Sequence, residues 1–230
     1  MELVSLSVHL AELRRRLWIV LIVWIGFSFG FYPWSLLLLD KITAPFDYVI
    51  FTDPMEVFSA RMGISFLGGV IFGGPVIAWQ IWAFIRPAMG KEYGRILLLL
   101  SLLSTFFFVA GVLFGHFVAV PLSLKFLLSS ASEKFLPMIS VSNYLNFWRS
   151  IVVAMGVTFL LPLVMAFLAM MRLVKYKQIA SLRRYLYVLI FIVSAVLGPP
   201  EVVSQISLAI PMIILFEIGV LSVRVINNRE

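Results

Sequence analysis

One carboxylate near the start of the chain stands among basic residues. The segment His9-Leu10-Ala11-Glu12-Leu13-Arg14-Arg15-Arg16-Leu17 places Glu12 beside three arginines, directly before a long apolar run. Its chemistry would be ionic pairing with a cation. Glu12 precedes Arg16 by four residues, and on a helix that spacing gives an exposed ion pair worth only about 0.3–0.5 kcal/mol. Spacing alone therefore favours a minor surface pair over a binding site.

Other polar groups also have types and positions that could do chemistry. Glu92 lies in the basic segment 90–95, where a solvated loop charge explains it. Glu217 lies within an apolar run, and ionisable groups inside a membrane are costly and often functional. Glu217 could respond to protons or bind a partner; equally, it could snorkel towards the membrane surface or hydrogen-bond to a neighbouring helix. His116 has no second histidine nearby, which indicates an interfacial residue rather than a metal ligand.

The sequence lacks the patterns that common enzymes need. It contains no cysteine, which excludes disulfides, thiolate metal sites and cysteine nucleophiles. We find no Gly-x-Ser-x-Gly, no Walker loop, no His-Glu-x-x-His and no paired intramembrane carboxylates. We therefore expect a protein without catalytic activity, cofactor or bound metal.

The composition indicates an integral membrane protein. Of the 230 residues, 62% are hydrophobic and 13% are charged, and the mean hydropathy is +1.07. A soluble domain of this size could not bury so much apolar surface. Because a helical span needs roughly 20 apolar residues, the chain can hold about six spans and little else. The formal charge of +7 fits basic cytoplasmic loops and does not require nucleic acid.

Six apolar segments are predicted to cross the membrane as helices. They cover approximately residues 17–31, 62–85, 96–120, 151–171, 185–197 and 202–223. The first could continue helically to Leu39, and the fifth, with about 13 apolar residues, is shorter than a usual span. We expect an all-α fold that forms a single integral membrane domain over residues 1–230.

The distribution of charge predicts the orientation of the chain. Most of the 18 lysines and arginines gather at the two termini and in loops 86–95 and 172–184. The positive-inside rule then places both termini in the cytoplasm. The long outer loops, 40–61 and 121–149, contain prolines together with apolar residues, so we expect them to form short helices that cap the outer face.

Proline interrupts several of the predicted spans. Pro75, Pro162 and Pro211 each lack a backbone donor and bend a helix. Ordinary packing and kinking explain these residues, since proline and glycine are common in membrane helices. The functional alternative is that several kinked helices together form a concave bundle.

Blocks of residues along nearly the whole chain carry a family resemblance. In order, they are His9-Leu10-x-Glu12-Leu13-Arg14-x-Arg16-Leu17, Ala44-Pro45, Pro75-Val76-Ile77-x-x-Gln80-x-Trp82-x-Phe84-Ile85-x-Pro87-Ala88, Phe117-x-x-x-x-Pro121-Leu122 with Tyr144, Pro199-Pro200-Glu201-Val202-x-Ser204-Gln205, and Ala209-Ile210-Pro211 through Phe216-Glu217-Ile218-Gly219. Together they closely resemble the TatC family, the polytopic core subunit of the twin-arginine protein translocase.

The resemblance implies a concave, glove-like bundle in the inner, cytoplasmic membrane that acts as a receptor for the twin-arginine signal peptides of folded proteins. It also implies single-span TatA/TatB-type partners, self-association, contact with lipid, and export driven by the proton-motive force. The residues it implies for signal-peptide binding are Glu12, Glu92, Arg14, Arg16, Phe84 and Pro87. Those it implies for structure or partner contact are Pro45, Tyr93, Glu201, Gln205, Pro211 and Glu217.

The chemistry of Glu12 fits the role that the resemblance implies for it. A guanidinium group pairs with a carboxylate through two hydrogen bonds, whereas lysine offers only a point charge. A carboxylate isolated among bases is therefore a plausible group for reading the arginines of another chain, with Arg14 and Arg16 shaping the site or binding lipid phosphates.

The chain departs from the family pattern at three positions. The glutamate of the first cytoplasmic loop usually lies where this chain has Tyr93, which leaves Glu92 as the nearest candidate. In the fourth span, Leu160 stands where many members have a glutamate implicated in contact with partner helices. Glu201 replaces the aspartate that follows the paired prolines in many members, and it keeps the charge.

Two other classes of function compete with the translocase. A secondary transporter of a small solute would be a different use of six spans, but the chain shows no internal repeat and no paired charges at mid-membrane. A purely structural membrane scaffold is disfavoured only through the resemblance.

Overall fold

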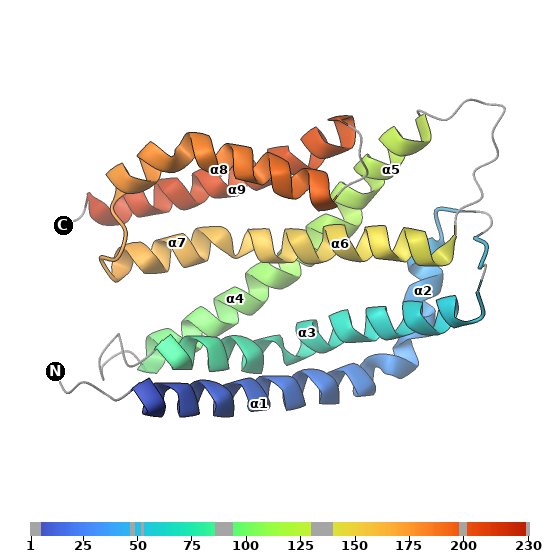
Figure 1. Ribbon diagram of the computed structural model, residues 1–230, viewed down its shortest axis with the longest axis horizontal. Helices are drawn as coiled ribbons and strands as arrows, with labels where there is room; N and C mark the ends of the chain where they lie inside the picture. The colour runs from blue at the N-terminus through green and yellow to red at the C-terminus, as the bar shows by residue number, and fades with distance from the viewer. Residues whose placement is uncertain are drawn as a thin grey trace. The chain divides into compact units, whose positions relative to one another are not determined.

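The computed structural model (Figure 1) describes residues 6–46, 49–51, 53–85, 94–129, 140–197 and 202–228. The helices are α1 (Leu6–Phe31), the 3-10 turn η1 (Tyr32–Trp34), α2 (Ser35–Thr43), α3 (Met55–Ile85), α4 (Gly94–Phe114), the π-helical η4 (Gly115–Ala119), α5 (Val120–Ser129), α6 (Val141–Phe159), α7 (Leu161–Met170), α8 (Tyr176–Leu197) and α9 (Val202–Asn227). In this part of the chain the one β-type pairing is an isolated bridge between Ile50 and Ser140. The predicted all-α fold is confirmed.

Six helical stretches are long and apolar enough to cross a membrane among the described residues. They are Leu10–Thr43, Met55–Ile85, Leu97–Leu128, Val141–Met170, Tyr176–Leu197 and Gln205–Asn227. Each corresponds to one of the six predicted segments. The number of spans is therefore as predicted, and the first continues through η1 and α2 as the sequence allowed.

The helices are longer than the apolar segments that predicted them. The fourth begins at Val141 rather than near residue 151, and the fifth begins at Tyr176 rather than near residue 185. Hydropathy ends where polar residues begin, but a helix continues through polar residues that face solvent or headgroups. At 22 residues, α8 is about 33 Å long, enough for a hydrocarbon core of about 30 Å.

The three prolines singled out in the sequence have different effects. Pro162 stands in the first turn of α7, directly after the break at Leu160 that ends α6, so the fourth span is two helices in series. Pro75 and Pro211 lie inside the continuous helices α3 and α9. Whether the kinked helices make a concave bundle stays a prediction.

The contacts of the chain group it into two units. The first comprises Met1–Asp47 and Pro54–Phe106, and the second comprises Tyr48–Asp53 and Phe107–Glu230. The predicted single membrane domain therefore stays a prediction, and each unit is described by itself below.

In the first unit, α1 and α3 lie antiparallel and side by side (Figure 1). Glycine makes this close approach possible, because a Cβ on Gly69 would lie 2.7 Å from the carbonyl oxygen of Trp24 and would clash with Ser28. Trp24 donates its indole N–H to the carbonyl of Phe66 at 2.9 Å. Glycine contact and this hydrogen bond set the register of α1 on α3, and with it the position of every polar group at the helix ends.

In the second unit, α6 packs on η4 with similar closeness. A Cβ on Gly115 of η4 would lie 2.9 Å from the Cα of Val152 in α6. Ile151 and Val152 are fully buried. Trp148 donates its indole N–H to Nδ1 of His116 at 3.0 Å, so the histidine is a hydrogen-bond acceptor inside the packed helices. Its expected position near the membrane interface stays a prediction.

The two long loops predicted for the outer side contain short helices and meet each other. Loop 40–61 contains the last turn of α2, and loop 121–149 contains nearly all of α5. Val141 donates its backbone N–H to the carbonyl of Ile50 at 2.9 Å, within the second unit. One backbone hydrogen bond thus joins residues of the two loops that are 91 positions apart in the chain.

Candidate functional site

A pocket of about 580 Å³ lies in the first unit between the start of α1 and the end of α3. Its lining consists of Ala11, Glu12, Arg15, Arg16, Ile19, Trp79 and Gln80. Helical periodicity explains the α1 side, because Glu12, Arg15, Arg16 and Ile19 lie three or four residues apart and share one face. The size falls in the range of ligand pockets, about 300–1,000 Å³.

The guanidinium of Arg16 is held by two helices in this pocket. Its Nε and Nη2 donate to the same oxygen of Glu12, Oε1, at 3.0 and 2.7 Å, and its Nη1 donates to Oε1 of Gln80 at 3.0 Å. The Arg16 and Glu12 side chains are only 23% and 31% exposed. The expected pair is therefore present, but it is partly shielded and tied to α3, which spacing on α1 could not reveal.

The second carboxylate oxygen of Glu12 differs from the first in its hydrogen bonding. Both donors of Arg16 reach Oε1, and Oε2 accepts no hydrogen bond from any described residue. A carboxylate can accept about four hydrogen bonds, so Glu12, which lines the pocket, keeps acceptor capacity. The arrangement suits a ligand with N–H donors, above all a guanidinium, which matches a carboxylate in geometry and charge.

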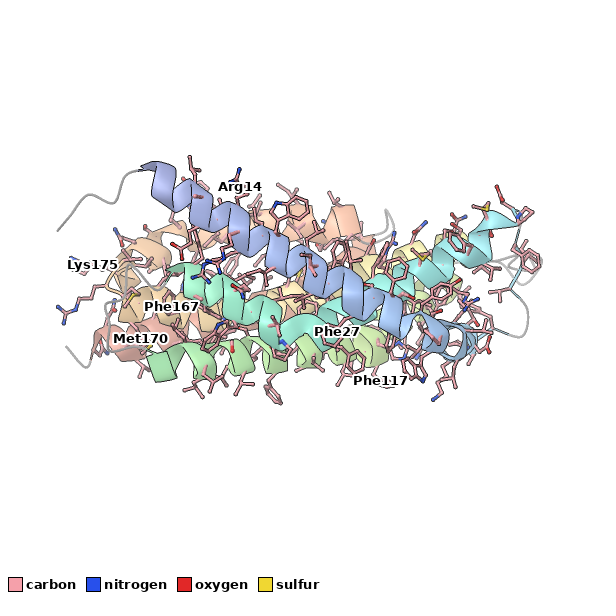
Figure 2. The ribbon with its side chains drawn as sticks, turned by 90° about the horizontal axis from the view of Figure 1, so that it is seen from below. Arg14, Phe27, Phe117, Phe167, Met170 and Lys175 are labelled. Atoms are coloured by element: carbon pink, nitrogen blue, oxygen red, sulfur yellow. The ribbon has the colours of Figure 1, made fainter. Side chains whose placement is uncertain are left out.

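Two of the other predicted binding residues lie outside this lining. Arg14 is exposed, and Figure 2 shows its side chain pointing away from α3. Phe84 lies one turn beyond Gln80 near the end of α3 and does not line the pocket. Glu92, Pro87 and Tyr93 lie outside the described residues.

Sequence reasoning did not single out Arg15, Trp79 or Gln80 as site residues. Gln80 stood in a family motif, and it is also a polar side chain in an otherwise apolar helix, a signal that could have marked it. Trp79 carried no such signal, since an aromatic side chain in an apolar run is more often part of the packing.

Glu217 has two partners on α8 in the second unit, where α8 and α9 lie antiparallel. Tyr187 donates its hydroxyl to Oε1 at 2.5 Å, and Nη2 of Arg183 lies 3.1 Å from Oε2. Arg183 and Tyr187 are one helical turn apart, so both reach the same carboxylate. Of the alternatives that the sequence left open, hydrogen bonding to a neighbouring helix is the one seen.

The remaining candidates have local roles or lie outside the description. Gln205 donates its amide to the carbonyl of Phe191 at 2.9 Å and so ties α9 to α8. Pro45 follows α2 in a turn where the N–H of Phe46 bonds to Thr43 at 3.0 Å. Glu201 is outside the described residues. In the part of the chain that is described, no three His, Cys, Asp or Glu side chains group as metal ligands would.

A second hollow in the first unit is larger and almost wholly apolar. It measures about 920 Å³. It is lined by residues of α1 and α2 together with Trp34 and Phe72, and the α1 residues include Gly26 and Gly30. Such a surface is suited to lipid or another apolar segment and offers no group for ionic recognition. The Glu12 pocket is therefore the candidate functional site.

Comparisons with known proteins point to one family. The model of the family described as Sec-independent protein translocase protein (TatC) matches residues 8–211. The TatC protein of Desulforapulum autotrophicum is 36% identical, over 96% of this chain and 85% of its own length. The TatC protein of Escherichia coli K12 is 34% identical, over 94% and 86%.

A solved structure agrees with these relatives. The crystal structure of a twin-arginine translocase receptor, TatC, superposes with a TM-score of 0.85 at 32% identity, over 95% of this chain and 99% of that one. These relatives are translocase proteins, so they support the translocase reading and lend nothing to a small-solute transporter.

Proposed function

The chain belongs to the TatC family of Sec-independent protein translocase proteins, and we propose that it binds the twin-arginine signal peptides of folded precursors through Glu12. It is a multi-pass membrane protein of the translocase. Its match to a structure described as a twin-arginine translocase receptor supports the receptor role.

The observation that carries the proposal is the unused acceptor of Glu12. Glu12 lines a pocket built by α1 and α3, and its Oε2 accepts nothing from the described residues. An incoming guanidinium can donate to that oxygen at the distances typical of charge-assisted hydrogen bonds, and each such bond contributes about 1.5–3 kcal/mol. Trp79 offers a ring on which a guanidinium could stack.

The second arginine of the signal needs its own acceptor, and we assign it to Glu92. That loop follows directly from α3, whose last turns carry Trp79 and Gln80 in the pocket. The chain is short enough between Ile85 and Glu92 for the carboxylate to reach the same end of the unit. Arg14, exposed on the other side of α1, suits contact with lipid phosphate better than contact with the peptide.

The partners and the location follow from the same proposal. The protein works with single-span TatA/TatB-type subunits, self-associates, and lies in the cytoplasmic membrane with both termini in the cytoplasm, powered by the proton-motive force. The positive-inside distribution supports the orientation. Leu160 lies at the apolar break between α6 and α7, so a partner helix contacting this span does so without a carboxylate there.

The test is the binding of a synthetic twin-arginine signal peptide to the full chain in detergent. Glu12→Gln keeps the shape of the side chain but removes its charge, and we expect affinity to fall about 10- to 100-fold. Glu56→Gln is the matched control, because Glu56 is in the first turn of α3, at the opposite end from Gln80. Unchanged affinity in a folded Glu12→Gln protein would sink the site.

A further inference from the structure

We propose that Arg16 is an internal competitor for the signal peptide: it holds Oε1 of Glu12 and offsets the charge of that carboxylate in the resting receptor, and it must be displaced before a signal residue gains the whole carboxylate. This inference rests on the proposed function and adds a residue that sets the threshold for recognition. It follows from the contacts of Arg16 in the pocket.

The first argument is chemical identity. Arg16 presents to Glu12 the same group that the signal presents, a guanidinium with its N–H donors. Two of these donors converge on Oε1, at 3.0 and 2.7 Å. A full two-oxygen fork between an incoming arginine and Glu12 needs Oε1, so the two guanidinium groups compete for the same atom.

The second argument is the anchor on α3. Nη1 of Arg16 donates to Oε1 of Gln80 at 3.0 Å, a contact between residues 64 positions apart. An ordinary pair on one helix would need no such partner. Gln80 holds Arg16 in the pocket, and it leaves an acceptor that can retain the guanidinium after the carboxylate is surrendered.

The third argument is charge. Among the described residues that line the pocket, Arg15 and Arg16 outnumber the single acid Glu12, although the proposed ligand is a cation. A cationic peptide gains little from such a pocket while Arg16 stays on the carboxylate. When Arg16 swings away, the negative charge of Glu12 becomes available to the peptide, and binding and displacement are one event.

Competition of this kind has a quantitative signature. The apparent dissociation constant equals the intrinsic one divided by the fraction of receptor whose site is free. Removing the competitor therefore improves the affinity of every ligand of Glu12 by the same factor. A residue that contacted the peptide directly would change different peptides by different factors.

The experiment measures a twin-arginine peptide and its twin-lysine counterpart on the full chain in detergent. With Arg16→Gln we expect both affinities to rise by one common factor, about 5- to 20-fold. Arg16→Lys keeps the charge but loses the fork, and we expect a smaller rise for both peptides. Arg15→Gln removes the same charge from the same pocket without a hydrogen bond to Glu12, and its rise should be smaller than that of Arg16→Gln.

Several outcomes would overturn the inference. A loss of affinity in Arg16→Gln would make Arg16 part of the binding surface. An equal rise in Arg15→Gln, or no rise in Arg16→Lys, would reduce the effect to net charge. If Arg16→Gln does not fold, Gln80→Met replaces it: this variant removes the anchor, and affinity must rise if Gln80 holds the competitor in place.

The same measurements separate this inference from the proposed function. In a Glu12→Gln background, Arg16→Gln should give no gain, because there is no carboxylate left to free. If Glu12→Gln alone leaves peptide affinity unchanged, the site assignment fails. If Glu12→Gln weakens peptide binding but Arg16→Gln brings no gain in affinity, Glu12 remains the binding residue and Arg16 is not a competitor.

Discussion

Glu12 and Glu217 are both carboxylates on spanning helices, each paired with an arginine, yet their oxygens are used differently. In the first unit, both contacts from Arg16 go to one oxygen of Glu12, and the other oxygen has no hydrogen-bond partner among the described residues. In the second unit, Tyr187 takes one oxygen of Glu217 and Arg183 takes the other. The exposed fractions of the two carboxylates are nearly equal, 31% and 32%.

The comparison teaches that exposure and charge do not separate a binding carboxylate from a structural one. What differs is the number of carboxylate oxygens that have a partner. Glu217 has a partner on each oxygen, which suits a clamp between α8 and α9, whereas one oxygen of Glu12 has none among the described residues, as the proposed binding role requires.

The largest expected effect is on signal-peptide binding, when the proposed acceptors Glu12 and Glu92 are removed. In the Glu12→Ala, Glu92→Ala double variant, crosslinking of a twin-arginine signal peptide should fall to background, because both proposed acceptors are gone. Each single variant should retain a part of the signal. Photo-crosslinking in membranes measures this, with Glu56→Ala treated in parallel. Wild-type crosslinking in a double variant that inserts normally contradicts the site.

A smaller effect is expected at the clamp. Glu217→Gln loses the ion pair with Arg183 while it can still accept from Tyr187, and we expect a loss of about 1–2 kcal/mol in stability. Peptide affinity should change less than twofold. Thermal unfolding in detergent and the peptide assay report the two quantities. A Glu217→Gln protein of normal stability with weakened peptide binding would reverse the two roles.

The smallest expected effect is on stability, when the single hydrogen bond from Tyr187 to Glu217 is removed. Tyr187→Phe removes only the hydroxyl that donates to Glu217, and interhelical hydrogen bonds in membranes average about 0.6 kcal/mol. We expect a shift of about that size in unfolding free energy, roughly half or less of the Glu217→Gln effect. A larger loss than in Glu217→Gln would show that the tyrosine hydroxyl, and not the ion pair with Arg183, contributes most to the clamp.

Hydropathy was enough to predict the six spans, because about 20 consecutive apolar residues have few other places to go. It could not place the start of α6 or α8, because Val141 to Arg149 and Tyr176 to Arg184 mix polar and apolar residues on a helical period. Where such a helix begins is decided by tertiary packing, as at Trp148 and His116, and not by composition.

The candidate site was predictable in part. Spacing on one helix predicted the pair of Glu12 with Arg16, and the family motifs marked Glu12 as important. Neither could predict Gln80 as the third member, because that contact depends on the register of α1 against α3. The register comes from the glycine contact at Gly69 and the indole hydrogen bond of Trp24, which are properties of the packed pair.

The π-helical turn η4 has a consequence for how the third span is built. Within η4 the N–H of Val120 bonds to the carbonyl of Gly115, five residues back, so this turn holds one residue more than an α-helical turn. One residue corresponds to about 100° of rotation around the axis. The extra residue therefore rotates α5 about the helix axis. The face that α5 presents differs from the one that an uninterrupted α-helix would present. Deleting a single residue between 115 and 119 would keep the span long enough to cross the membrane, yet point its last ten residues in another direction.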